Sequence, residues 1–591
     1  MNLHPDYLLN EVNEPEDIKG MTLQQLQQLA TEMRTLVLER DEKIGGHVGP
    51  NLGTMELTIA LHYVFDSPHD KVIWDVSHQS YAHKMLTGRK LGFLDPDHYE
   101  DVTGYTSPEE SDHDLFEVGH TSTSIALAVG EAEARDLQDP QSKDDVIAVI
   151  GDGSLSGGLA FEGLNNATKV KGNLIIVVND NEMSIDENQG GLYQGLKELR
   201  ASNGQAANNI FTFMGLDYRY VEDGNDLATM IEAFRGVKDV DHPVVLHVHT
   251  LKGKGFKPAE EEKMRYHWRS PFNPKTGADL QPAPKETYSG AIIDELERLI
   301  EAGTPIAAIN AAIPGAFDLK RFEKKYPDRY FDVGIAEQMS VSSAVAMAQA
   351  GIRPVLFENS TFLQRAYDEL SHDVALNNDP ATLLVYLAGA YGMNDESHLG
   401  LYDIPFLSHI PNFVYLAPTN KEELVAMTNW AIDQPDHPVA IRVPAVALET
   451  TGQADTTDYG DLNKNQVVHQ GSKVAIFGVG NLLGLAKQAA AKLAEEGVDA
   501  TVINPRYLTG LDTELLDQLQ ADHQVVVTLE DGILEGGYGQ TIASYLGDSA
   551  VRVQNYGLQK AYPDRYDVNE LLAQNGLTAD NIAQQALKAL N

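Results

Sequence analysis

The sequence predicts an α/β protein with three parallel-sheet domains, and three observations indicate it. Short apolar runs typical of buried parallel strands alternate with helical patterns rich in small residues. The 591 residues are enough for several separate cores. Two polar stretches, 258–283 and 452–466, have the composition of connections. We therefore expect domains over 1–283, with its linker at the end, 284–450 and 467–591.

The expected strands are the short runs of β-branched and apolar residues. In the first domain they cover 71–76, 146–150 and 174–179. In the second they cover 305–309, 354–357, 382–386, 413–416 and 439–443. In the third they cover 473–477, 500–503 and 524–529. A small-residue pattern over 122–134 predicts one of the helices that cover such sheets.

Composition excludes several classes of function. Lys and Arg number 44 against 87 Asp and Glu, for a net charge of −43, so neither a nucleic acid nor an anionic membrane is an expected partner. No apolar run approaches the ~18 residues of a membrane span, and the acidic start has no signal-peptide core. The absence of Cys excludes disulfides, iron–sulfur clusters and a Cys nucleophile. A cytoplasmic enzyme is the expectation.

Two polar motifs follow two expected strands. Gly151-Asp152-Gly153 ends one apolar run and Asn179-Asp180-Asn181 ends the next, with 27 residues between Gly153 and Asn181. Strand carboxyl ends are where α/β sheets bind ligands, and a helix expected to start near Leu155 would point its N–H groups at a phosphate. Asp152, Asn181 and a carbonyl near Met183 offer the oxygen ligands that Mg²⁺ prefers. The motifs predict a diphosphate–magnesium site.

Several longer segments carry a family resemblance. They include VIGDGSLSGGLAFEGLNNA, NDNEMSI, VGHTSTSIA, KGKGFKPAE, FDVGIAEQ and STFLQRAYDEL. In content and order they resemble 1-deoxy-D-xylulose-5-phosphate synthase, a family of the transketolase superfamily. The resemblance implies a transketolase-like fold and a homodimer that binds thiamine diphosphate between the first two domains of one subunit. It indicates a role in isoprenoid biosynthesis, with synthesis of a vitamin precursor or other sugar metabolism as the alternatives.

The resemblance assigns cofactor-binding residues. Besides Asp152, Asn181 and Glu337, the residues that match the family's cofactor contacts are His78, Gly119, His120, Thr121, Gly153, Ser154, Phe256 and Phe362. Thiamine diphosphate needs one buried carboxylate beside N1′ of its aminopyrimidine, so that the imino nitrogen can remove the C2 proton. Glu337, in Gly334-Ile-Ala-Glu-Gln338, matches that carboxylate, although a plain helix-start glutamate is the alternative. Phe362 would stack on the aminopyrimidine, or would be a core aromatic.

Three further histidines match residues that face the substrate in the family. They are His47, His267 and His398. An imidazole can move protons near neutral pH or hold an oxyanion. Each of them, taken alone, is equally compatible with a structural role.

The acceptor side departs from the family pattern. The family's DRAG and YPRG motifs are Tyr386-Leu-Ala-Gly389 and Val443-Pro-Ala-Val446 here, so Leu387 and Ala445 replace two phosphate-binding arginines. Asn359 replaces a tyrosine and Asn394 replaces an aspartate. Arg365 remains as an acceptor-side candidate, with a helix-surface pair with Asp368 or Glu369 as the alternative. Losing two charge-assisted hydrogen bonds would weaken phosphate binding by about 3–6 kcal/mol. We therefore expect an acceptor other than glyceraldehyde 3-phosphate to be preferred.

The expected activity is a carboligation. Pyruvate would add to the cofactor, lose CO₂ and pass its two-carbon unit to an aldehyde acceptor. The alternatives are a transketolase that moves a ketol unit from a ketose, the first component of a 2-oxo acid dehydrogenase, and a non-catalytic regulator. Release of CO₂ from pyruvate would distinguish the carboligase from the transketolase.

Overall fold

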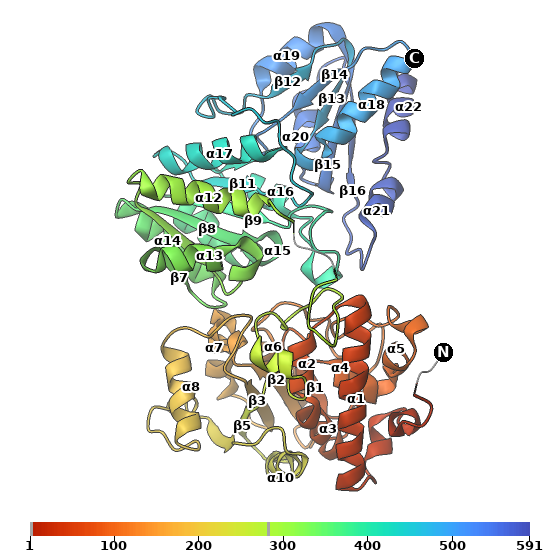
Figure 1. Cartoon of the computed structure of the whole chain (residues 1–591), viewed down its shortest axis with the longest axis vertical. Helices are drawn as coiled ribbons and strands as arrows, with labels where there is room; N and C mark the ends of the chain where they lie inside the picture. The colour runs from red at the N-terminus through yellow and green to blue at the C-terminus, as the bar shows by residue number, and fades with distance from the viewer. Residues whose placement is uncertain (1–3, 281–283, 591) are drawn as a thin grey trace. The chain divides into compact units, whose positions relative to one another are not determined.

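The computed structural model describes residues 4–280 and 284–590. The chain divides into two compact units, residues 1–283 with 334–336 and residues 284–333 with 337–591. The described residues form three sheets, one in each of the three segments expected to be domains (Figure 1). Of the helices in the described part, none is long and apolar enough to cross a membrane. The prediction of parallel-sheet α/β architecture is confirmed, whereas the three-domain division stays a prediction.

The sheet of the first unit has five parallel strands in the order β1-β2-β3-β5-β4. The strands are β1 (Lys71–Trp74), β2 (Val146–Gly151), β3 (Leu174–Asp180), β4 (Asp217–Val221) and β5 (Pro243–His249). The longer helices around them are α1 (Leu23–Ile44), α3 (Met55–Val64), α6 (Ser124–Gln138), α7 (Gly158–Ala167), α8 (Gly191–Ala201) and α10 (Leu227–Val237).

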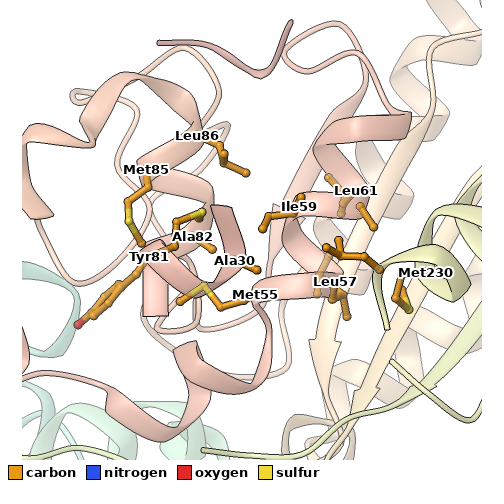
Figure 2. Packing of buried hydrophobic residues seen from close by; sticks show 14 of the residues in the cluster. Ala30, Met55, Leu57, Ile59, Leu61, Tyr81, Ala82, Met85, Leu86 and Met230 are labelled. Carbon is orange, nitrogen blue, oxygen red and sulfur yellow. The ribbon is translucent and has the colours of Figure 1, made fainter. Parts of the chain in front are cut away.

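Alternation along the strands gives each face of this sheet its own core. In β2, Ile147 and Val149 pack with α1, α3 and α10, whereas Ala148 and Ile150 pack with α6, α7 and α8. Figure 2 shows part of the first core, with Met55 beside Ala30 and the Leu57 side of α3 toward Met230. Both faces are therefore covered, as a parallel sheet requires.

The second unit contains two sheets. One is parallel, in the order β10-β11-β9-β8-β6-β7. Its strands are β6 (Ile306–Asn310), β7 (Tyr330–Asp332), β8 (Arg353–Asn359), β9 (Thr382–Tyr386), β10 (Val414–Leu416) and β11 (Val439–Arg442). Its main helices are α12 (Tyr288–Glu301), α13 (Leu319–Lys325), α14 (Glu337–Gln349), α16 (Asp403–Ser408) and α17 (Lys421–Asp433).

The other sheet of this unit has the order β12-β14-β13-β15-β16. Its strands are β12 (Gln466–His469), β13 (Lys473–Gly478), β14 (Thr501–Asn504), β15 (His523–Ile533) and β16 (Arg552–Leu558). Its helices are α18 (Leu483–Glu495), α19 (Thr513–Asp522), α20 (Tyr538–Tyr545), α21 (Val568–Gln574) and α22 (Ala579–Leu590). One core cluster joins this sheet to the first sheet of the unit, with Tyr415 of β10 and Phe477 of β13 among its members.

Two expectations from the sequence were wrong in detail. No α-helix starts at Leu155: residues Gly153–Ser156 form a 3-10 turn, Gly157 is extended, and α7 begins at Gly158. Gln466 is part of strand β12, which pairs antiparallel with β14, and not of a linker. All four residues of β12 are exposed, and its two valines, Val467 and Val468, are too few to form an apolar run like those of the buried strands. The stretch 258–283 includes the end of the short helix α11 (Lys257–Glu261), and its residues 281–283 lie outside the described residues.

Candidate active site

The two strand-end motifs of the first unit lie side by side. Strands β2 and β3 are adjacent and parallel, with Gly151 opposite Asn179. The N–H of Asp152 donates to the carbonyl of Asn179 across 3.1 Å. Because both strands end at the same edge, Asp152 and Asn181 follow at neighbouring positions, as the spacing of the motifs predicts.

The chemistry of these two side chains fits a hard cation. Asp152 is almost completely buried, and burial followed by repulsion from Asp180 raises the pKa of its carboxyl well above the usual value. Among the described residues, Oδ1 of Asn181 is buried and has no hydrogen-bond partner. A buried amide oxygen that accepts no hydrogen bond is available to coordinate a cation. The backbone of Met183 forms a bridge with Glu187 in the same loop.

Gly153 lies so close to Ser184 that a larger residue does not fit at position 153. A Cβ added to Gly153 would come 2.6 Å from Cβ of Ser184, so only glycine lets the 152–154 turn and the 181–187 loop approach each other. Asn188 Nδ2 donates to Asp152 Oδ2 at 2.7 Å, and Tyr193 donates to the carbonyl of Gly153 at 3.0 Å. The segment after β3 therefore folds back over the Asp152 turn.

Three of the predicted histidines converge in the first unit. The ring centroids of His47 and His78 are 5.1 Å apart, those of His78 and His267 are 5.1 Å apart, and those of His47 and His267 are 5.8 Å apart. Burial lowers the pKa of His267 well below its usual value, and nearby Lys252 and the other two imidazoles lower it further. His267 is therefore a neutral imidazole at neutral pH, able to accept a proton.

Lys252 is a member of this cluster that the sequence reasoning missed. Its Nζ lies 3.1 Å from His267 Nδ1 and donates to the carbonyl of Ser184 at 2.6 Å. Burial lowers the pKa of this amine to about 7, although Asp152 opposes the shift. The signal was present, since Lys252 opens the KGKGF segment that carries part of the family resemblance.

Asp75, also missed, connects the loops of the predicted cofactor residues. Its two carboxylate oxygens accept from the N–H groups of Ser122 and Ser124 at 2.8 and 3.0 Å. Ser122 Oγ in turn donates to the carbonyl of Ser154 at 2.7 Å. The loop with His78, the loop with Gly119, His120 and Thr121, and the turn with Gly153 and Ser154 are thus tied together.

Phe256 has a different environment from the other predicted cofactor residues. Its ring packs edge-on against Tyr266, at 5.5 Å, and tilted against Phe272, at 6.3 Å. It lies partly buried against the core of the first unit. This packing accounts for the aromatic residue without a ligand, so its assignment to the cofactor stays a prediction.

In the second unit, Glu337 is the first residue of α14 and is 4% exposed. Arg365 Nη1 lies 3.3 and 3.5 Å from its two carboxylate oxygens. The sequence offered Asp368 or Glu369 as the partner of Arg365, whereas the structure pairs it with Glu337. Arg365 reaches back from the 3-10 turn Gln364–Ala366 to the buried start of α14, and its place on the acceptor side stays a prediction.

Phe362 and His398 come together in this unit. Their ring centroids are 5.6 Å apart and nearly perpendicular. His398 is buried, and its Nδ1 lies 2.8 Å from Ser397 Oγ and 3.6 Å from Asp395. The contact joins the two side chains that the resemblance assigns to the cofactor and to the substrate.

The four residues that differ from the family on the acceptor side have distinct surroundings. Asn359 is buried, and its Oδ1 has no partner among the described residues. Leu387 has a positive φ of 52° directly after β9, and Ala445 follows β11. Asn394 is exposed and donates to the carbonyl of Tyr566 at 3.1 Å.

A cluster of three or more His, Cys, Asp or Glu residues that could hold a metal does not occur in the described ranges. The predicted magnesium site needs only one such side chain, Asp152, beside an amide and a carbonyl, so this finding does not test it.

Comparisons with known proteins agree on the class of the chain. Residues 9–209 match the family model described as 1-deoxy-D-xylulose-5-phosphate synthase. Residues 285–450 match the transketolase pyrimidine-binding domain, and residues 463–582 match the transketolase C-terminal domain. Together with the three sheets, these matches define a transferase of the transketolase-like α/β class.

Curated relatives narrow the assignment. The chain is 38% identical to 1-deoxy-D-xylulose-5-phosphate synthase 1 of Geobacter metallireducens, over 97% of this chain and 98% of that protein. It is 38% identical to the synthases of Pelotomaculum thermopropionicum and Desulfitobacterium hafniense, over 98% and 99% of this chain and 97% and 98% of those proteins. The chain belongs to the 1-deoxy-D-xylulose-5-phosphate synthase family.

Proposed function

We propose that the protein is a thiamine diphosphate-dependent carboligase that decarboxylates pyruvate and transfers the two-carbon unit to an aldehyde. The observation that carries the proposal is the unpartnered amide oxygen of Asn181 beside buried Asp152, at the ends of two adjacent strands. Family membership over nearly the whole chain supports the same reaction.

Asp152, Asn181 and the carbonyl of Met183 would hold Mg²⁺, and the Gly153–Ser154 turn would take the diphosphate. When bound, the cofactor supplies a carbon nucleophile and an electron sink. Glu337 would hold a proton at N1′ of the aminopyrimidine, and Phe362 would pack on that ring. Gly119, His120 and Thr121 would complete the cofactor contacts from their loop, and His78 would complete them from the loop after β1.

Proton handling on the substrate is proposed for the histidine cluster. His267, neutral because burial lowers its pKa, can accept a proton from a substrate hydroxyl. Lys252 can return one near neutral pH, since burial lowers the pKa of its amine to about 7. His47 and His398 would bind the carboxylate or oxyanion of the substrate.

On the acceptor side, we propose a small aldehyde without a phosphate. Leu387 and Ala445 offer no charge to a phosphate, whereas the buried, unpartnered Oδ1 of Asn359 can accept from a hydroxyl. A KM for D-glyceraldehyde below that for glyceraldehyde 3-phosphate is the expected result. Efficient turnover with a low KM for the phosphorylated aldehyde would refute this assignment.

Binding of the cofactor is tested by titration calorimetry with and without Mg²⁺. We expect uptake of thiamine diphosphate by the wild-type protein only with the metal. Asn181→Leu should weaken magnesium-dependent binding of thiamine diphosphate. Because Asn181 is a proposed direct ligand, the loss should exceed the roughly 10–100-fold that follows removal of a residue that only hydrogen-bonds a ligand. The control is Asn165→Leu, at an exposed position of α7, which should bind as the wild type does. Equal binding by wild type and Asn181→Leu would contradict the proposed site.

Three further expectations rest on the resemblance and remain proposals. They are a homodimer, a cytoplasmic location and a role in isoprenoid biosynthesis. Sedimentation of the purified protein tests the first, since a single species with the mass of one chain would exclude a stable dimer.

A further inference from the structure

A second buried carboxyl group faces the start of α14. Glu358 is the penultimate residue of β8 and is 4% exposed. Side chains alternate along a strand, and Leu356 packs in the same core as Val341 and Ala344 of α14. Glu358 therefore points to the face that α14 covers, and Glu337 is the first residue of that helix.

The charges around Glu358 do not balance. Arg365, which pairs with Glu337, also attracts Glu358, while Glu337 and Asp332 of β7 repel it. Within the described residues its one hydrogen-bond donor is the N–H of Asn359, at 2.9 Å. The guanidinium of Arg365 thus attracts Glu358, while two carboxyl groups, those of Glu337 and Asp332, repel it. An unpaired buried carboxylate is so unfavourable that the group binds a proton instead.

The direction of the titration agrees with this charge count. Burial, followed by repulsion from Glu337, raises the pKa of Glu358 well above its usual value, and the N–H of Asn359 and Arg365 oppose the shift only in part. Two adjacent carboxyl groups that repel each other titrate as a pair.

We propose that Glu337 and Glu358 together hold one proton at neutral pH, and that this proton is the one delivered to N1′ when thiamine diphosphate binds. The inference rests on the proposed function, in which Glu337 contacts the aminopyrimidine. One proton leaves the carboxyl pair, the ring nitrogen gains it, and none is taken from solvent. Without a neutral carboxyl partner beside Glu337, the proton for N1′ would have to come from water. Glu358 is thus a positioning residue, which acts through Glu337.

The first test counts protons during cofactor binding. Calorimetric titration of thiamine diphosphate and Mg²⁺, in buffers of different ionisation enthalpy, gives the number of protons exchanged. We expect almost no uptake by the wild type and about one proton per site by Glu358→Gln, whose amide keeps the shape of a neutral acid. The affinity of the variant should then fall about tenfold per pH unit above neutrality. Equal uptake by both proteins would overturn the inference.

A matched control removes another buried acid of the same unit. Burial raises the pKa of Glu530, in β15, to about 7, and its carboxylate accepts from the N–H groups of Tyr538 and Gly539. Glu530→Gln should leave proton uptake on cofactor binding at the wild-type value. A change equal to that of Glu358→Gln would mean that the effect is not local to Glu337, and would contradict the inference.

A second readout needs no cofactor. Because folding raises the pKa of Glu358 above its unfolded value of 4.5, the folded protein keeps a proton that the unfolded chain releases. The stabilising contribution is complete below that value and is lost as pH rises. Glu358→Gln should therefore gain thermal stability over the wild type at about pH 8–9 and lose that advantage near about pH 5. Parallel pH–stability curves would overturn the inference. Failure of the wild type to bind the cofactor would overturn the proposed function as well.

Discussion

Asp75 joins two loops of the first unit through both of its carboxylate oxygens. Burial raises the pKa of this carboxyl, and the N–H groups of Ser122 and Ser124 counter the shift. One bound N–H belongs to the first residue of α6, where the helix dipole favours a negative charge. The Asp75 carboxylate therefore affects both the stability of the loop before α6 and the placement of His120 in that loop.

Asp75→Asn should weaken this connection, because an amide offers only one acceptor oxygen and no charge. A hydrogen bond to a charged group contributes about 1.5–3 kcal/mol, so we expect a drop of several degrees in Tm and weaker binding of thiamine diphosphate. Differential scanning calorimetry and isothermal titration measure the two effects. Asp226→Asn is the matched control, since Asp226 caps α10 and Asn is an equally good cap. An Asp75→Asn protein with unchanged cofactor affinity would contradict the proposed link.

Much of the candidate site could be predicted at the residue scale, and the reason is local. Asp152, Gly153 and Asn181 lie in short motifs that directly follow apolar strands, so residue type and position appear together in the sequence. The roles of Asp75 and Glu358 could not be predicted in this way. Asp75 accepts hydrogen bonds from Ser122 and Ser124, which lie 47 and 49 positions further along the chain. The pKa of Glu358 depends on Glu337, which belongs to another element.

At the scale of elements, the strand cores were predictable because buried parallel strands are continuous apolar runs. The expected 382–386 is β9 as observed, and the expected 174–179 is β3 to within one residue. Strand β12 could not be predicted, because its residues are exposed and its pairing with β14 depends on the rest of the sheet. The start of α7 was misplaced because a 3-10 turn separates it from β2.

The approach of the 152–154 turn to the 181–187 loop gives a prediction at this scale. Gly153→Ala would place a Cβ 2.6 Å from Cβ of Ser184 and 3.0 Å from its Cα, so the loop must move away from Asp152. We expect weaker magnesium-dependent binding of thiamine diphosphate, measured by calorimetry. Gly151→Ala is the control, because its Cβ would meet no atom within 4 Å. Equal affinities of the two variants would show that the close approach is not required.

At the scale of the molecule, a buried ionic cluster joins the two sheets of the second unit. Arg442 of β11 pairs with Asp403 of α16 at 2.7 Å and with Asp531 of β15, and Tyr415 of β10 donates to Asp403. All four side chains are buried. Such a cluster strongly penalises the loss of any one member, because an uncompensated charge stays buried.

Arg442→Met should therefore destabilise the second unit by about 3–5 kcal/mol. The triple variant Arg442→Met, Asp403→Asn, Asp531→Asn should recover most of that loss, since no charge remains unpaired. Urea unfolding followed by fluorescence measures both. If the triple variant were as unstable as the single one, packing and not charge pairing would be the main contribution of Arg442.

The central claim is that the chain decarboxylates pyruvate and joins the remaining two carbons to an aldehyde. The most direct test supplies thiamine diphosphate, Mg²⁺, D-glyceraldehyde and pyruvate labelled at a known carbon, with product analysis by NMR. We expect labelled CO₂ from the carboxyl carbon and the other two carbons bonded to the aldehyde, with both lost in Glu337→Gln. Pyruvate that keeps its label, with no CO₂ released and no bond to the aldehyde, would contradict the account.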